Sequence, residues 1–548
     1  MSKGAVAAGH PETVSAARSI LDNGGNAYDA VLASAAMACV AEPVLASLGG
    51  GGFLLAKPAD QSQGPVLYDF FAQTPKRRKP MGKPLDGSEG PVEFHPILAN
   101  FGTVTQEFHI GAGSVATPGM VPGIFAIYDD LCTMPLGEIL RPAIERANSG
   151  VSVTAFQAYL FSVVEAIYIR EPESLGCYGS PGGGLAKEGD VICNPQLADT
   201  LETLASEGED LFRVGEIARS ICTLCDQFGS HLSADDLQGY QVERRQPLIE
   251  IYRGAKIITN PGPSTGGVLI AFALKLLERL NISKVPLSNI PYGSGEYYDL
   301  LAQVMAATNS ARIKSDQGDL HHLLDDKLLA HYEQRILGRP ASHRGTTHIS
   351  IIDAKGNAAA MTLSNGEGCA HMVPGAGFML NNMLGEEDIN PLGFHNWPEN
   401  TRLSSMMAPT MIETTIETAI GHEDHTLTVL GSGGSNRIRT ALLQVILNLI
   451  DQNMDLASAI DAPRIHYEND MLNIEVADEF TAIDELRARY EGVLPVMPVI
   501  PWDSRNMFFG GVHAVSVLNC GKLGAQSKKY QEFHAMGDQR RNGACSII

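Results

Sequence analysis

The stretch TTHISIIDAKGNAAAMTLS, residues 346–364, predicts a β-hairpin. Residues 346–352 are rich in β-branched side chains, residues 353–357 have the composition of a turn, and residues 358–364 have that of a return strand. With Lys355 at the centre of the turn, residues equally far from it face each other across the hairpin. Thr346 is therefore expected opposite Ser364, with both side chains on one face.

The facing hydroxyls suggest a nucleophile, although a Thr–Ser pair alone is most often structural. Gly345 precedes Thr346 at the end of a polar stretch without periodicity, residues 340–345. If the chain is cut between Gly345 and Thr346, the threonine gains a free α-amine with an unperturbed pKa near 8. That amine can accept the proton of its own hydroxyl, so one residue supplies both nucleophile and general base. The hairpin thus predicts cleavage before Thr346 and a nucleophilic Thr346.

The remaining chain reads as a mixture of helices and strands without an internal repeat or a linker between independent domains. We expect helices over residues 7–26 and 26–40, the first ending at a Gly-Gly pair, and a buried strand over 53–56. Residues 73–101 are expected to be mainly loop, and residues 115–345 mainly helical. Short strands separated by helices are expected after residue 346, for example at 426–430 and 512–518.

Composition limits the class of protein. The chain has 548 residues, of which 44% are hydrophobic and 19% charged, so a globular protein is expected. Its formal net charge of −22 argues against nucleic acid as a partner. Nine cysteines, an odd number, do not form a disulfide framework. The start of the chain lacks the apolar segment of a secretory signal, and the longest apolar run, residues 30–40, is shorter than a membrane helix. We therefore expect a cytoplasmic protein without a membrane partner.

Other motifs give no competing chemistry. The glycine-rich stretches contain neither a phosphate-binding loop nor a dinucleotide fingerprint, so turns and close packing explain them better. The pair Cys222 and Cys225, like the histidines at 321, 322, 422 and 425, lacks the partners of a metal site. No nucleophile-elbow serine is present. We expect no cofactor and no metal.

At these residues the sequence resembles the γ-glutamyltranspeptidase family of N-terminal-nucleophile hydrolases. The resemblance extends over nearly the whole chain, and its motifs occur in the family's order. They are residues 24–30, 48–53, 115–119, 261–267, 346–350, 380–382, 404–406, 431–434 and 509–512. Each motif is weak alone, whereas the ordered set is specific.

The resemblance implies an α+β fold, namely the four-layer αββα sandwich of N-terminal-nucleophile hydrolases. It implies self-cleavage at Gly345–Thr346 into a heavy subunit, 1–345, and a light subunit, 346–548, interwoven in one globular unit. Cleavage would give a heterodimer of the heavy and light subunits, and the resemblance leaves open whether this heterodimer forms a higher oligomer. Thr346 would form the acyl-enzyme, and Ser364 would support it. Gly433 and Gly434 match the glycines whose N–H groups form the oxyanion hole.

The residues that match the family's acyl-recognition set are altered. Ser404 and Ser405 match the pair that helps to hold the glutamyl α-carboxylate. The arginine that grips this carboxylate in the family aligns with Phe71, which cannot form a bidentate contact. The asparagine that binds the α-amino group aligns one position from Asn365, and its acidic partner aligns with Glu386 or, alternatively, Glu387. Arg77 or Arg78 is the nearest cation that could replace the missing arginine.

Three hypotheses about function follow. The leading one is a self-processing amidohydrolase or acyltransferase that cleaves γ-glutamyl or related amides, with water or an amine as the acceptor. The second is an acylase of the glutaryl-cephalosporin type, because its acyl group lacks the α-amino group. The third is a non-catalytic homologue, which the presence of Thr346, Ser364 and the two glycines argues against.

Overall fold

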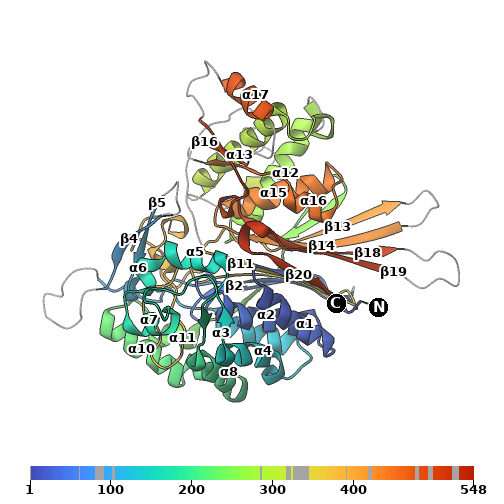
Figure 1. Ribbon diagram of the computed structural model, residues 1–548. Coiled ribbons are helices and arrows are strands. Elements are labelled where there is room, and N and C mark those ends of the chain that lie inside the picture. Colours follow the sequence, from blue (N-terminus) through green and yellow to red (C-terminus); the bar gives the residue numbers. More distant parts are fainter. Residues whose placement is uncertain are drawn as a thin grey trace.

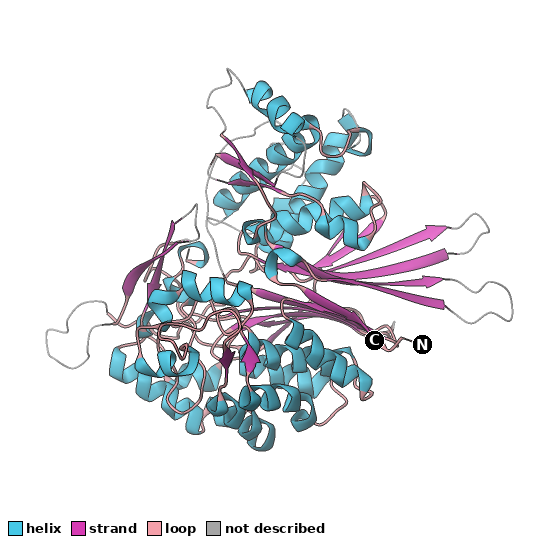
Figure 2. Ribbon diagram, viewed as in Figure 1, coloured by secondary structure: helices cyan, strands magenta, loops and turns pink. Residues whose placement is uncertain are grey.

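The computed structural model shows a mixed helix and sheet protein (Figures 1 and 2). It describes residues 2–60, 62–80, 92–100, 105–283, 287–315, 323–324, 345–390, 392–417, 423–468, 470–475, 480–490, 498–520 and 530–548. In these residues no helix is both long and apolar enough to cross a bilayer. Residues 340–344, which precede the expected cleavage site, lie outside the described residues.

The expected hairpin forms strands β11 (Thr347–Asp353) and β12 (Ala358–Ser364). Thr347 pairs with Leu363 and Ile352 with Ala358, so the predicted register is confirmed. The Asp353 carboxylate holds the turn by accepting hydrogen bonds from the backbone nitrogens of Lys355 (2.9 Å) and Asn357 (3.0 Å). Its other oxygen accepts from the Asn357 side chain and from the first N–H of helix α2, that of Ala27. One buried carboxylate thus closes the turn and attaches it to a helix N-terminus, where negative charge is favoured.

The hairpin lies in the middle of a seven-stranded sheet whose strand order is β20-β1-β11-β12-β2-β3-β8. Each strand of this sheet is antiparallel to its neighbours. Strands that precede residue 345 and strands that follow it are therefore hydrogen-bonded in one sheet. The further bounds are β20 Ala544–Ile547, β1 Gly4–Ala8, β2 Gly51–Lys57, β3 Val66–Phe70 and β8 Glu243–Arg245.

A second, six-stranded sheet packs on the first, with strand order β19-β18-β14-β13-β10-β9. Its strands β14 and β18 contact β11 of the first sheet (Figure 1). Its bounds are β19 Tyr530–Met536, β18 Gly511–Cys520, β14 Glu423–Gly433, β13 Thr410–Glu417, β10 Ala255–Thr259 and β9 Leu248–Tyr252.

The first sheet is buried on both faces. In β1, Val6 and Ala8 belong to one hydrophobic cluster, whereas Ala5 and Ala7 belong to the other. Because successive side chains of a strand point to opposite faces, the two clusters lie on opposite sides of the sheet. Strands with two buried faces show a continuous apolar run rather than alternation, and the sequence of β1 is such a run.

Helices cover the outer face of each sheet (Figure 1). Helices α1 (Pro11–Asp22) and α2 (Ala27–Ala41) contact β1, β11 and β12. Helices α12 (Gly266–Ser283), α15 (Arg437–Ile450) and α16 (Leu456–Asp461) contact strands of the second sheet. The core therefore extends on both sides of the strand that begins next to Thr346.

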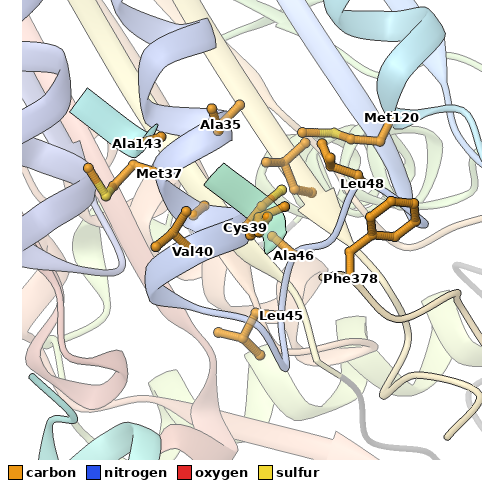
Figure 3. Close-up of a cluster of buried hydrophobic side chains, with 14 of the residues drawn as sticks. Ala35, Met37, Cys39, Val40, Leu45, Ala46, Leu48, Met120, Ala143 and Phe378 are labelled. Carbon is orange, nitrogen blue, oxygen red and sulfur yellow. The ribbon is translucent and has the colours of Figure 1, made fainter. Parts of the chain in front are cut away.

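Helix α2 is buried on all sides, since every one of its residues is buried. A capping box of Asn26 and Asp29 begins it. The chain beyond its end, which contains Leu45, Ala46 and Leu48, stays in the same apolar cluster (Figure 3). This packing fixes the loop that passes the expected cleavage site.

The other elements lie around this frame. The strands among them are β4 (His95–Asn100), β5 (Thr105–Ile110), β6 (Val151–Ser152), β7 (Val191–Ile192), β15 (Ile465–Glu468), β16 (Met471–Glu475) and β17 (Val499–Trp502). The helices are α3 (Met120–Leu131), α4 (Leu136–Ser149), α5 (Ala155–Val163), α6 (Glu165–Tyr168), α7 (Pro172–Tyr178), α8 (Pro195–Glu207), α9 (Asp210–Arg213), α10 (Glu216–Phe228), α11 (Ala234–Gly239), α13 (Gly295–Ser315) and α17 (Phe480–Tyr490).

Two expectations from the sequence were wrong, one about the start of a helix and one about a strand. The first helix begins at Pro11 rather than at residue 7, because residues 4–8 form β1 and His10 caps the helix. A short apolar run cannot be divided between strand and helix by periodicity alone. Residues 95–100, expected to be loop, form β4, paired with β5.

We predict that Asp353→Ala lowers the free energy of unfolding by about 1–3 kcal/mol, because it leaves the buried N–H of Ala27 in α2 and two partly buried N–H groups of the turn without their acceptor. Urea unfolding of the variant measures this loss. Lys355→Ala, an exposed substitution in the same turn, is the control and should change stability by less than about 0.5 kcal/mol. Equal effects of both substitutions would contradict the role of Asp353.

Candidate active site

Two hydroxyls meet at the carbonyl oxygen of Gly345. Thr346 Oγ1 donates to Gly345 O at 2.8 Å, and Ser364 Oγ donates to the same oxygen at 2.8 Å. Ser364 Oγ also accepts from the Gly366 nitrogen at 3.1 Å, which fixes the direction of its own hydrogen. Both side chains are buried, Thr346 being 4% and Ser364 8% exposed. The two donors polarise the carbonyl beside the Thr346 hydroxyl.

Gly345 is held closely on several sides. Its nitrogen donates to Glu367 Oε1 at 3.2 Å. A Cβ added at Gly345 would lie 2.9 Å from Gly366 O and 3.2 Å from Leu45 Cδ2, the side chain seen in Figure 3. The peptide before Thr346 therefore has little freedom to move. Glu367 was not among the residues expected from the sequence, although an acidic residue in the glycine-rich turn directly after the return strand was a usable signal.

Gly433 and Gly434 lie against the nucleophile residue. Gly433 ends β14, and a Cβ there would lie 2.1 Å from Thr346 O, so only glycine permits this approach. Gly434 follows with φ +121°, a conformation that favours glycine. The fold thus brings residues more than eighty positions apart to one place. The oxyanion-hole role of the two N–H groups stays a prediction.

Arg541 reaches the same place from near the C-terminus. Its Nη1 donates to Thr346 O at 3.4 Å. The side chain is 5% exposed, and burial lowers the pKa of its guanidinium to about 10, so it remains cationic at neutral pH. Sequence analysis did not single it out, because nothing in the local sequence connects residue 541 with residue 346.

The second threonine of the motif binds a buried carboxyl group. Thr347 Oγ1 donates to Glu42 Oε2 at 2.8 Å, and Thr13 Oγ1 donates to Glu42 Oε1 at 2.9 Å. Burial raises the pKa of the Glu42 carboxyl to about 7, and the two hydroxyls only partly oppose this. Glu42 thereby ties the start of β11 to the segment that follows α2.

The neighbouring imidazole is not placed to act as a base for Thr346. The two ring nitrogens of His348 pair with Thr362 Oγ1 at 2.8 Å and Ser350 Oγ at 2.9 Å. Burial lowers the pKa of His348 well below its ordinary value. A Thr–His pair is therefore a poor explanation of the site, and the α-amine of a cleaved chain is the better candidate for the base.

The residues expected to bind the α-amino group lie beside the turn that follows β12. Glu386 is buried, and a Cβ at Gly366 would lie 2.5 Å from Glu386 Oε1. Asn382 Oδ1 accepts from the Glu367 nitrogen at 2.9 Å and so shapes the same turn. Asn365 is fully buried, and neither polar atom of its side chain has a hydrogen-bond partner in the described residues. Asn365 thus directly follows Ser364, and Glu386 lies against Gly366 in the same turn; their binding roles stay predictions.

Ser404 and Ser405 have different surroundings. Ser405 Oγ accepts from the Met407 nitrogen at 3.1 Å, and Ser405 O accepts from Ser264 Oγ at 2.8 Å, so Ser405 organises its own loop. Ser404 is half-buried and lines a mainly apolar pocket with about 190 Å³ of space for water, together with Ile389 and Trp397. Of the two, Ser404 has the more accessible position.

Phe71 belongs to the core rather than to an open surface. It is 3% exposed, and its ring stacks on that of Phe53 with centroids 5.4 Å apart. A guanidinium at this position would be buried among apolar side chains. Arg77 and Arg78 are exposed, and the Arg78 guanidinium donates to His395 O. The predicted contact of Phe71 with substrate stays a prediction.

Within the part of the chain that the structure describes, no three His, Cys, Asp or Glu side chains come together as metal ligands.

Comparison with known proteins gives matches over nearly the whole chain. The model of the family Gamma-glutamyltranspeptidase matches residues 13–548. The chain is 30% identical over 507 residues to the Acylase ACY 1 proenzyme of Pseudomonas sp. (strain V22), covering 89% of this chain and 87% of that protein. It is 27% identical over 580 residues to the Glutathione hydrolase proenzyme of Bacillus subtilis (strain 168), covering 99% and 91%. The cephalosporin acylase from Bacillus halodurans has the same fold, with a TM-score of 0.77 at 22% identity over 100% of this chain and 96% of that one.

We predict that Glu42 makes stability depend on pH between about 4.5 and 7. Its pKa is raised in the folded state, so the protonated carboxyl stabilises the fold below pH 4.5, and this contribution is lost as the pH rises to 7. Glu42→Gln keeps the neutral form at every pH. The melting temperature of the variant should therefore rise relative to wild type between pH 5 and pH 8, by an amount that corresponds to up to about 3 kcal/mol.

Glu145→Gln, at an exposed position of α4, is the matched control and should follow wild type across the range. A difference between Glu42→Gln and wild type that does not change with pH would contradict the raised pKa.

Proposed function

Because the chain belongs to the γ-glutamyltranspeptidase family, we propose that it is a self-processing amidohydrolase or acyltransferase with Thr346 as its nucleophile. The observation that carries the proposal is the carbonyl oxygen of Gly345, which accepts hydrogen bonds from both Thr346 and Ser364. Relatives described as proenzymes of an acylase and of a glutathione hydrolase support processing and amide cleavage.

Processing begins with attack of Thr346 Oγ1 on the carbonyl carbon of Gly345. The Gly345–Thr346 C–N bond breaks, the proton passes to the threonine nitrogen, and an ester joins Gly345 to Oγ1. Water then hydrolyses the ester and releases Gly345 as a carboxylate. Ser364 stabilises the negative charge that develops on the carbonyl oxygen, because its hydroxyl already donates there.

Turnover uses the freed α-amine of Thr346 as the general base. The amine takes the Oγ1 proton while the oxygen attacks the amide carbonyl of the substrate, and it then gives that proton to the departing amine. The N–H groups of Gly433 and Gly434 hold the oxyanion; removal of such a donor typically costs about 3–4 kcal/mol. Water or an amine attacks the acyl-enzyme and restores the hydroxyl.

The subunits proposed are a heavy chain, 1–345, and a light chain, 346–548. Strand β1 of the former pairs with β11 and β20 of the latter, and β12 pairs with β2. These ladders would keep the two chains together after cleavage. We also propose that the two stacked sheets and their outer helices are the four-layer αββα sandwich of N-terminal-nucleophile hydrolases.

The default substrates are γ-glutamyl amides. A glutaryl-type acylase is the second candidate, because a glutaryl group lacks the α-amino group, and the asparagine that binds this amino group in the family aligns one position from Asn365. Hydrolysis of γ-glutamyl and glutaryl anilides, measured side by side on the processed protein, separates these candidates. A processed protein that cleaves neither anilide would favour the non-catalytic homologue.

We predict that Thr346→Ala leaves one unprocessed chain, because no hydroxyl remains to attack Gly345. A denaturing gel measures this, and N-terminal sequencing of the smaller wild-type band should begin at Thr346. Thr346→Ser keeps a hydroxyl and should still process. Two normal subunits in Thr346→Ala would disprove the assignment.

Ser364→Ala should slow processing or turnover by about tenfold without abolishing either. A hydrogen bond between neutral groups contributes about 0.5–1.5 kcal/mol net, and 1.4 kcal/mol is a factor of ten in rate. The fraction of processed chain over time and the rate of anilide hydrolysis measure the effect. Ser364→Thr is the control that retains the hydroxyl; unchanged rates in Ser364→Ala would remove its proposed role.

A further inference from the structure

Arg541 is a buried cation without a carboxylate partner in the described residues. Its Nη1 donates to Thr346 O, and its Nε has no hydrogen-bond partner there. The adjacent Arg540, by contrast, is bound by Glu475 and Asp538. The charge of Asp538 also acts on Arg541, but the ion pairs of Asp538 are with Arg540 and with Arg464, which donates to it at 2.7 Å. Among the described residues, Arg541 therefore forms no ion pair of its own.

An unpaired buried guanidinium is costly. Removing a charge from water without an ion-pair partner is unfavourable, and buried charges in proteins are normally paired. Burial lowers the pKa of Arg541 to about 10, which leaves the group charged at neutral pH. A cation that stays charged and unpaired beside a nucleophile is prepared for an anion that arrives with a ligand.

The protein makes room for this side chain with three glycines. A Cβ at Gly511 would lie 2.7 Å from Arg541 Cβ, and one at Gly433 would lie 3.1 Å from Nη1. A Cβ at Gly434 would lie 3.3 Å from Nη2. The guanidinium therefore lies directly beside the two glycines proposed as the oxyanion hole and beside the main chain of Thr346.

We propose that Arg541 is the anion-binding residue of the acyl site, where it holds a carboxylate carried by the acyl group. This inference rests on the proposed function, since it assigns the acyl group that Thr346 receives. Thr346 O and Thr346 Oγ1 belong to one residue, so an anion at Arg541 lies only a few ångströms from the carbonyl under attack. With C–C bonds of about 1.5 Å, the carboxylate is separated from that carbonyl by roughly two to four carbons. The substrate class is the monoamide of a short dicarboxylic acid.

Other arginines near the acyl-recognition residues have different roles. Arg402 donates to Phe71 O and to Gln241 O, and it forms an ion pair with Asp69 at 3.4 Å. Arg77 and Arg78 are exposed and contact neither Thr346 nor Ser364 in the described structure. Arg541 thus supplies, from the opposite end of the chain, the cation that Phe71 cannot provide.

The test compares two acyl anilides that differ only in charge: glutaryl p-nitroanilide and its neutral analogue, in which a primary amide replaces the carboxylate. Processed wild-type enzyme should prefer the glutaryl compound by at least tenfold in kcat/KM. Arg541→Met should lower kcat/KM for the glutaryl compound by about 10- to 100-fold, as expected for one or two charge-assisted hydrogen bonds. The same variant should change the neutral compound by less than about threefold.

Arg77→Met is the matched control, because it removes an exposed arginine that contacts neither Thr346 nor Ser364 in the described structure, and it should leave both values unchanged. Arg541→Lys keeps the charge without the planar fork and should fall between wild type and Arg541→Met. Because Arg541 contacts Thr346, a denaturing gel first establishes that each variant is processed.

The outcomes separate this inference from the proposed function. A processed wild-type enzyme that cleaves both anilides with kcat/KM values within threefold of each other overturns the role of Arg541 and leaves the amidase intact. Equal losses on both compounds in Arg541→Met show a structural role only and also overturn it. A processed enzyme that cleaves neither compound contradicts the proposed function itself. If Arg541→Met is not processed, Arg541→Lys provides the test. A ratio of kcat/KM for the charged and neutral compounds that equals the wild-type ratio in Arg541→Lys would overturn the proposed contact between the guanidinium and the carboxylate.

Discussion

The shared hydrogen bonding of Thr346 and Ser364 to the Gly345 carbonyl depends on the register of β11 and β12. A slip of one residue would turn every side chain of a strand to the opposite face, and the two hydroxyls would separate. The register is held at the far end of the hairpin by the Asp353 carboxylate, which closes the turn. The reactive end is thus fixed by a buried polar group seven residues away along the strand.

Burial on both faces explains how the fold tolerates an interrupted chain near its centre. The strand that begins beside Thr346 is paired with β1 on one side and β12 on the other, and apolar clusters cover both faces of the sheet. Little of this stabilisation passes through the Gly345–Thr346 peptide bond itself. A cut at that bond removes one covalent link and leaves the ladders and the core contacts in place.

Burial has different effects on the protonation of the two ionisable groups near Thr346, Glu42 and Arg541. Glu42 is buried with two hydroxyl donors and, in the part of the chain that the structure describes, forms no ion pair, so burial raises its pKa to about 7. Arg541 is equally buried and remains charged, because a guanidinium is far too basic to lose its proton there. The site thus holds the buried cation Arg541 on one side of Thr346 and the buried acids Glu367 and Glu386 around the turn that follows β12. In this proposal Arg541 is the group that holds an acyl group with negative charge.

The sequence by itself determined the hairpin, its register and the facing of Thr346 with Ser364, because turn residues and strand composition act locally. It also determined the family, through motifs in a fixed order. Only the tertiary structure brought Gly433 and Arg541 to the nucleophile, since these residues lie 87 and 195 positions from Thr346 in the chain. It also placed Phe71 in the core, where its ring stacks on that of Phe53. The boundary between β1 and α1 was not predicted from the sequence for a related reason. Because β1 is buried on both faces, its sequence lacks the alternation of apolar and polar residues that marks a strand.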